Sequence, residues 1–86
     1  MSYVYIVECA DKTLYTGYTE DITVRLHSHN TGQGAKYTRG RRPVKLRYLE
    51  LCANKNEALR RESSLKKLSR QAKLNLIATQ ANKYEK

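Results

Sequence analysis

The sequence is poor in cysteine, in acidic residues and in long apolar runs. Its two cysteines, Cys9 and Cys52, cannot form a disulfide framework and are too few for a structural zinc site. Both lie in apolar runs, so we expect buried free thiols in a reducing cytosol. The sequence therefore predicts a cytoplasmic protein whose fold depends on packing and not on cross-links.

No apolar run approaches the ~18 consecutive residues that a membrane span requires, so we expect no contact with a membrane. The first residues run directly into a strand-like segment without a basic start, which argues against a secretory signal peptide. A length of 86 residues with a hydrophobic fraction of 40% is enough for one small core. We therefore predict a single domain over residues 1–80, followed by a polar tail over residues 81–86.

Acidic residues are scarce: eight Asp and Glu face seventeen Lys and Arg, which gives a formal net charge of +9. The excess arises between residues 36 and 70, where twelve basic residues face three acidic ones. Such a concentration of one sign suits a polyanion, most simply a nucleic acid, and Arg39, Arg41 and Arg42 are the candidate contacts. The alternative is a solvated basic face, or one that contacts the ribosome.

The hydrophobic pattern predicts an α+β fold in the order strand, strand, helix, strand, helix, helix. Residues 3–9 and 14–18 are rich in β-branched and aromatic side chains and should form an antiparallel hairpin. A third strand, over residues 44–51, would complete a small three-stranded antiparallel sheet flanked by helices. The remaining segments are helices over residues 20–30, 54–68 and 69–77, and a basic loop over residues 31–43.

The expected helix starts carry capping signals. Thr19 or Asp21 is a suitable N-cap for the first helix, with Glu20 in its first turn. The segment from Asn54 to Glu57 resembles a capping box, and Ser69 is a suitable cap for the last helix.

Arg25 and His29 border the apolar stripe of the first predicted helix. They lie four residues apart, beside the stripe that Ile22 and Leu26 begin. His27 points away from this stripe, so the two histidines do not make a joint metal site. Taken alone, His29 is more simply explained as a half-buried histidine with satisfied hydrogen bonds.

Glu62 lies in the middle of the apolar face of the helix that begins after Asn54, between Ala58 and Leu65. A carboxylate rarely takes such a position without a cation, a strong donor or a metal. The sequence leaves two explanations open: an ion pair with an arginine at the edge of the core, or a hard divalent cation.

Tyr5 and Tyr15 lie on the two strands of the predicted hairpin, which can bring them close together. Gly17 follows Tyr15 by two residues, and a glycine within a strand often marks the close approach of a backbone or a ligand. The chain has seven tyrosines and no phenylalanine or tryptophan, so some tyrosines must fill the core.

Together these residues resemble the motifs of the GIY-YIG nucleases. Tyr3-Val4-Tyr5 followed by Tyr15-Thr16-Gly17 is similar to the paired motif of that family, and Arg25 and His29 continue the resemblance. Residues 34–38 look like the loop of its structure-specific repair members, and residues 57–62 are similar to the helix with its metal-binding glutamate. The chain departs from the family in having Tyr3 where a glycine is usual, and Asn75 is no clear match for its supporting asparagine.

The resemblance implies cleavage of phosphodiester bonds with Mg²⁺ or Mn²⁺. By this analogy Glu62 would hold one metal ion against the phosphate, and Arg25 would stabilise the charge that develops there. Lys36 would clamp a phosphate from the loop.

The resemblance also implies roles for the two tyrosines and the histidine. Tyr5 would take a proton from the attacking water, with a pKa lowered from its usual ~10 by the nearby cations. Tyr15 and His29 would orient the water and the phosphate, with His29 as a relay to Tyr5.

The predicted function is therefore metal-dependent hydrolysis of structured or single-stranded DNA, with a role in DNA repair. Relatives generally obtain target choice from appended modules, so a protein partner is expected to supply it here. The alternative is a non-catalytic module that binds nucleic acid or the ribosome. Binding alone would not require a carboxylate on an apolar helix face, which favours the nuclease.

Overall fold

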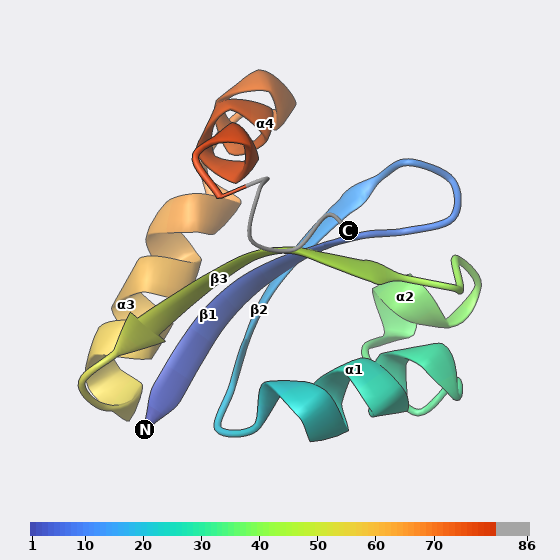
Figure 1. Ribbon diagram of the computed structural model, residues 1–86, viewed down its shortest axis with the longest axis horizontal. Coiled ribbons are helices and arrows are strands. Elements are labelled where there is room, and N and C mark those ends of the chain that lie inside the picture. Colours follow the sequence, from blue (N-terminus) through green and yellow to red (C-terminus); the bar gives the residue numbers. More distant parts are fainter. Residues whose placement is uncertain (81–86) are drawn as a thin grey trace.

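The computed structural model describes residues 1–80 and contains a three-stranded antiparallel sheet with helices on both faces (Figure 1). The sheet order is β2-β1-β3, with β1 in the middle. This arrangement confirms the predicted α+β class and antiparallel sheet, whereas the predicted tail at residues 81–86 lies outside the described residues. The strands are β1 (Ser2–Glu8), β2 (Leu14–Thr19) and β3 (Lys45–Cys52).

Alternating side chains along β1 serve two separate cores. Val4 and Ile6 face one side of the sheet, where α3 (Lys55–Lys66) and α4 (Arg70–Ala78) pack. Tyr5 and Val7 face the other side, which α1 (Ile22–Asn30) covers (Figure 1). All four side chains are fully buried, so the central strand is covered on both faces. The cysteines follow the same alternation: Cys52 lies in the first core and Cys9 in the second, both as free thiols.

The helix starts follow the capping signals. Side-chain oxygens of Asp21, Asn54 and Ser69 accept hydrogen bonds from the backbone N–H three residues later. The expectation that Glu20 lies in the first turn is wrong, because α1 begins at Ile22. The carboxylate of Glu20 instead accepts a hydrogen bond of 2.6 Å from the hydroxyl of Ser2.

The basic loop predicted over residues 31–43 contains a short helix, α2 (Lys36–Arg39), that the sequence did not reveal. Four residues are too few for a hydrophobic period, and Ala35 at the N-cap has no side-chain acceptor. The helix is anchored by the side chain of Thr38, which is fully buried against α1. Tertiary contacts therefore stabilise α2, and local preference does not.

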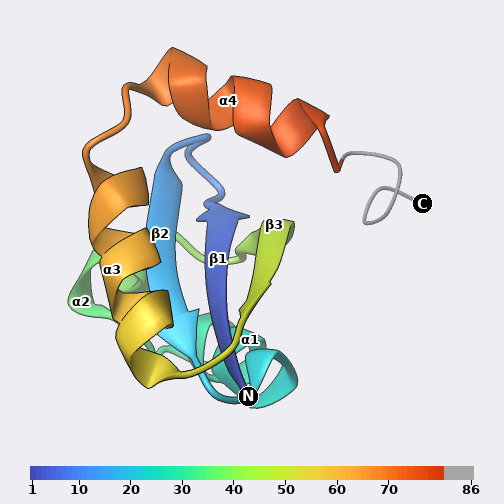
Figure 2. The ribbon, with the colours of Figure 1, turned by 90° about the vertical axis from the view of Figure 1, so that its left-hand side faces the viewer.

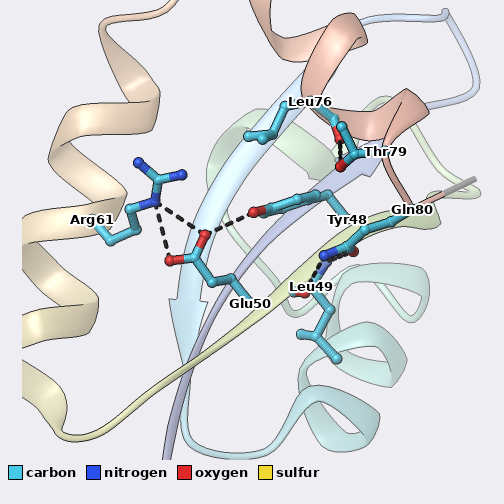
Figure 3. A network of polar contacts seen from close by, with 7 residues as sticks. All are labelled: Tyr48, Leu49, Glu50, Arg61, Leu76, Thr79 and Gln80. Atoms are coloured by element: carbon cyan, nitrogen blue, oxygen red, sulfur yellow. Dashed lines mark hydrogen bonds and ion pairs between the residues drawn. The ribbon is translucent and has the colours of Figure 1, made fainter.

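Gln80 closes the outer edge of β3 just beyond α4 (Figure 3). Its side-chain amide accepts from the backbone N–H of Leu49 and donates to the carbonyl of Leu49, each over 3.1 Å. In the same region Glu50 accepts from the hydroxyl of Tyr48 over 2.7 Å and pairs with Nε of Arg61 at 3.0 Å. These contacts tie both C-terminal helices to β3.

Candidate active site

The hairpin places Tyr5 directly opposite Gly17. Their Cα atoms are partners in the β1–β2 register, and Tyr15 pairs with Val7 on the same face. A Cβ atom on Gly17 would overlap the hydroxyl oxygen of Tyr5 and lie 2.6 Å from its Cζ. The close approach predicted at this glycine is therefore made by the ring of Tyr5, which crosses β2 without hindrance.

Helix α1 brings two side chains to the hydroxyl of Tyr5. Nε2 of His29 lies 2.8 Å from the phenol oxygen, and Nε of Arg25 donates to the same oxygen over 3.2 Å. On its other side, Nδ1 of His29 lies 2.8 Å from Oγ1 of Thr38 on α2. Because Arg25 and His29 are one turn apart, a single helix face presents both to β1.

These hydrogen bonds have a definite direction. The hydroxyl of Thr38 has one proton, which it donates to the carbonyl of Ala35 over 2.9 Å. Nδ1 of His29 must then be the donor to Thr38, which leaves the lone pair of Nε2 to accept the proton of Tyr5. The phenol oxygen keeps its lone pairs for Arg25. The chain therefore directs the proton of Tyr5 toward His29.

Burial controls the pKa values of this pair. It raises the pKa of Tyr5, and the hydrogen bond and charge of Arg25 oppose this effect without overcoming it. The prediction that nearby cations lower the pKa of Tyr5 is therefore wrong. Burial also lowers the pKa of His29, and the charge of Arg25 acts in the same direction. At neutral pH the pair is a neutral phenol and a neutral imidazole, as the hydrogen-bond directions require.

Arg25 and Tyr15 form the surface above this pair. Tyr5 and His29 have no exposed area, whereas Arg25 and Tyr15 are half-buried. Hydrogen bonding to Tyr5 raises the pKa of Arg25, with a smaller contribution from Tyr15. The solvent-facing part of this cluster is therefore a permanent cation and a tyrosine, and the neutral pair is buried behind them.

Tyr15 begins a column of rings that leads out to solvent. Its ring meets the edge of His29 with the centroids 5.6 Å apart and stacks on Tyr37 with the centroids 5.8 Å apart. The guanidinium carbon of Arg41 lies 4.0 Å from the centroid of Tyr37. The column therefore links the buried histidine to an exposed tyrosine–arginine pair.

Glu62 approaches the same region from α3, which lies beside β2 (Figure 2). Its side chain is 19% exposed, and its Oε2 lies 3.3 Å from Nζ of Lys66 in the next turn. Burial is the main cause of the raised pKa of Tyr5 and of Tyr18, and the negative charge of Glu62 makes a smaller contribution in the same direction. The carboxylate thus has a lysine partner and not the arginine considered above, and it acts on the tyrosines of β1 and β2.

The surroundings of Glu62 suit a hard cation with a single protein ligand. Within residues 1–80, no cluster of three His, Cys, Asp or Glu side chains could hold a metal ion. A partly exposed carboxylate leaves room for water and phosphate oxygens, which Mg²⁺ accepts readily as its remaining ligands. Glu62 therefore fits a metal ion that the protein and its substrate bind together.

The four basic residues predicted to contact nucleic acid differ in their surroundings. Lys36 and Arg39 are exposed on α2. Nε of Arg41 pairs with Asp11 at 3.0 Å, and Arg42 donates to the carbonyl of Arg39 over 3.0 Å. Asp11 offsets part of the charge of Arg41, so Lys36 and Arg39 present their charges more openly. An open depression of about 410 Å³ is lined by Asn30, Arg39, Gly40, Arg42 and Pro43.

Sequence reasoning missed the contributions of Gly34, Tyr37 and Thr38. A Cβ atom on Gly34 would overlap Nδ1 of His29 and lie 2.8 Å from its Cα, so the loop approaches the histidine because no side chain intervenes. The available signal was the likeness of residues 34–38 to a family loop, and that signal assigned no role to these three residues. Asn75 is exposed on α4, where it accepts from Gln71 over 3.0 Å.

A family model described as the GIY-YIG catalytic domain matches residues 1–75. The chain belongs to the GIY-YIG family. The match contains Tyr5, Tyr15, Arg25, His29 and Glu62. GIY-YIG domains are generally nuclease domains that use divalent metal ions, so membership implies a nucleic acid as substrate.

Several bacterial relatives share this GIY-YIG domain over most of its length. A UPF0213 protein of Streptococcus agalactiae is 56% identical over 94% of this chain and 92% of its own. A UPF0213 protein of Clostridium perfringens is 54% identical over 99% of this chain and 91% of its own. None of these names states a reaction.

A solved relative supports the fold of this GIY-YIG domain. The solution NMR structure of a UPF0213 protein from Bacillus halodurans is 46% identical, with a TM-score of 0.62. The similarity covers 99% of this chain and 92% of that one. In the part of the chain that the structure describes, no helix has the length and apolar character needed to cross a bilayer.

Proposed function

We propose that this GIY-YIG domain hydrolyses phosphodiester bonds in structured or single-stranded DNA with one Mg²⁺ or Mn²⁺ ion. The observation that carries the proposal is the directed chain of hydrogen bonds from Arg25 through Tyr5 and His29 to Thr38. It joins a cation and a proton relay at one phenol oxygen, and a surface that only binds DNA does not require such a relay.

The Tyr5–His29 pair accounts for activation of the attacking water. The water loses a proton to the phenol oxygen of Tyr5 while the proton of Tyr5 passes to Nε2 of His29. The hydroxide so formed attacks phosphorus, the bond from phosphorus to the leaving oxygen breaks, and that oxygen takes a proton from solvent. His29 then returns its proton to the phenol oxygen of Tyr5, which passes its own proton to solvent and so restores the neutral pair. The raised pKa of Tyr5 and the lowered pKa of His29 keep both groups neutral before each cycle.

Arg25 has two positions in this scheme. In the structure its guanidinium donates a hydrogen bond to the hydroxyl of Tyr5, which is fully buried. Because the Arg25 side chain is half-exposed, it can turn outward to a phosphate oxygen and uncover Tyr5. A bound phosphate therefore both receives the positive charge and opens the relay.

Glu62 is the residue that would hold the metal ion. When bound there, the ion supplies positive charge that stabilises the phosphate and the leaving oxygen. Lys66 pairs with Glu62 in the structure and would stay close to a phosphate bound through that metal ion. A cytoplasmic location, a role in DNA repair and a protein partner that supplies target choice stay predictions.

Glu62→Gln tests this proposal because it removes the charge of the metal ligand and preserves its shape. Labelled single-stranded, duplex and flap DNA are incubated with the protein in Mg²⁺, Mn²⁺ or EDTA. We expect cleavage to need a metal ion and to fall by about 10²–10⁴-fold in the variant. DNA binding in EDTA should persist or increase slightly, since one negative charge is removed.

Glu57→Gln is the matched control, because Glu57 lies exposed in the first turn of the same helix. It should cut DNA like the unchanged protein, and thermal melting should show that both variants fold. A folded Glu62→Gln variant that cuts at the unchanged rate would contradict the assignment of the site. Binding without cleavage of any substrate in either metal would instead favour the non-catalytic module.

A further inference from the structure

The exposed end of the aromatic column is not used by the hydrolytic scheme. Tyr37 is 39% exposed although its ring contacts Tyr15 and Arg41. Arg41 is fixed there by its ion pair with Asp11 and by a hydrogen bond of 2.8 Å from Nη1 to the carbonyl of Tyr37. An aromatic ring and a guanidinium thus form a rigid platform at the solvent end of the column.

We propose that the Tyr37–Arg41 platform stacks an unpaired nucleobase beside the scissile phosphate. Aromatic rings and guanidinium planes are the groups on which proteins stack unpaired bases. Within a duplex both faces of a base are covered by its neighbours, so only an unstacked base can reach the platform. The preferred substrate is therefore a single strand, or the unpaired strand of a flap. This inference rests on the proposed function and narrows its substrate class.

The surroundings of Arg41 support stacking over simple attraction to phosphate. The carboxylate of Asp11 lies 3.0 Å from Nε of Arg41 and offsets part of its charge. Its guanidinium lies over the Tyr37 ring and bonds to the neighbouring carbonyl, and both contacts restrict its orientation. Lys36 and Arg39 are exposed on α2, the helix that contains Tyr37. They are placed to attract the phosphate backbone of the nucleic acid instead.

The platform is also fixed relative to the proposed relay. Thr38, next to Tyr37 in α2, is bonded to His29, and the ring of Tyr15 lies between Tyr37 and His29. A base on the platform would therefore lie a fixed distance along the strand from the phosphate on Arg25. Sensitivity to the base should be confined to one position of the strand.

The first test measures binding in EDTA to a single-stranded oligonucleotide and to a blunt duplex of the same length. Tyr37→Leu should weaken binding to the single strand by about 5- to 100-fold and leave duplex binding nearly unchanged. Tyr37→Phe keeps the ring and should bind like the unchanged protein. Arg39→Gln, the control on the same helix, should weaken both complexes about equally. Equal losses on both substrates with Tyr37→Leu would overturn the proposal.

A second test uses the unchanged protein and so does not depend on whether a variant folds. Each nucleotide of the single strand is replaced in turn by an abasic site, in an oligonucleotide too short to bind in several registers. We expect an abasic site at one position to reduce affinity by about tenfold and an abasic site at any other position to have little effect. If no position stands out, the platform does not hold a base. Both tests measure binding, so failure to cleave DNA would overturn the nuclease and leave this result standing.

Discussion

At the scale of single residues, two glycines decide how the candidate site is assembled. Gly17 lets the ring of Tyr5 cross β2, and Gly34 lets the loop lie against His29. A methyl group at either position would overlap a polar atom of the relay. The geometry around Tyr5 and His29 therefore depends on residues that contribute no side-chain chemistry.

His29 provides a prediction about pH and stability. Its pKa is lowered in the folded protein by burial and by Arg25, so the unfolded chain binds its proton more tightly. The stability from neutral His29 is complete above the unfolded value of ~6.5 and is lost as the pH falls through the lowered pKa. The free energy of unfolding should fall by at most about 1.4 kcal/mol per pH unit in that range.

Urea unfolding between pH 7.5 and pH 5 measures this dependence. His29→Gln should remove it, although that variant is less stable at every pH. His27→Gln is the matched control, because His27 is exposed on the same helix and should leave the dependence intact. The same slope in both variants would contradict a buried neutral His29.

At the scale of elements, two short segments hold the site and the edge of the sheet in place. Helix α2 has only four residues, yet Thr38 faces the relay, Tyr37 joins the column, and Lys36 and Arg39 face solvent. At the edge of the sheet, Gln80 bonds to both backbone groups of Leu49 on β3. The position of each segment depends on its tertiary contacts more than on the hydrophobic pattern of its own sequence.

We expect the side chain of Gln80 to protect the edge of β3 from pairing with other chains. An edge strand with free backbone groups can pair with another molecule, and the amide of Gln80 fills that place at Leu49. Gln80→Ala removes two hydrogen bonds and should cost roughly 1–2 kcal/mol of unfolding free energy. It should also increase self-association with concentration, measured by light scattering.

Thr79→Ala is the control for this prediction. The hydroxyl of Thr79 bonds within its own helix end, to the carbonyl of Leu76 (Figure 3). Its removal should change neither the sheet edge nor the association state. Light scattering that is identical for Gln80→Ala and the unchanged protein would show that the edge is protected by other means.

At the scale of the whole molecule, charge is distributed unevenly between the basic segment and the rest of the chain. The net charge of +9 arises within residues 36–70, which include α2, β3 and α3. Within that segment some arginines have acidic partners: Arg41 pairs with Asp11 and Arg61 with Glu50. Lys36 and Arg39 are exposed near the site and should contribute more to the attraction for DNA.

The salt dependence of DNA binding tests this difference. For every phosphate that the protein no longer neutralises, the slope of log K against log salt should flatten by roughly 0.7–0.9. Lys36→Gln with Arg39→Gln should therefore flatten the slope more than Arg41→Gln with Arg42→Gln, which removes the same formal charge. Affinity should fall about equally for all sequences. Equal slopes for the two double variants would show that the ion pair with Asp11 does not reduce the contribution of Arg41 to DNA binding.

The sequence by itself determined the order of the strands and longer helices, their caps and the family. Val4 to Val7 could be assigned to a strand, and Asn54 and Ser69 to helix starts, because these signals act between neighbours in the chain. Tyr5, Tyr15, Arg25, His29 and Glu62 were selected because polar groups near apolar stripes are unusual and match a known motif. Those assignments require no knowledge of how the elements pack.

The tertiary structure decided the chemistry of the site. The existence of α2, the proton position on His29 and the contact between Tyr15 and Tyr37 all depend on residues from different elements. The pKa of Tyr5 shows the reason most clearly. The sequence revealed the cations that lower it, whereas the burial that raises it depends on the whole packed core. Desolvation is the larger of these effects, and it is a property of the folded molecule and of no single segment.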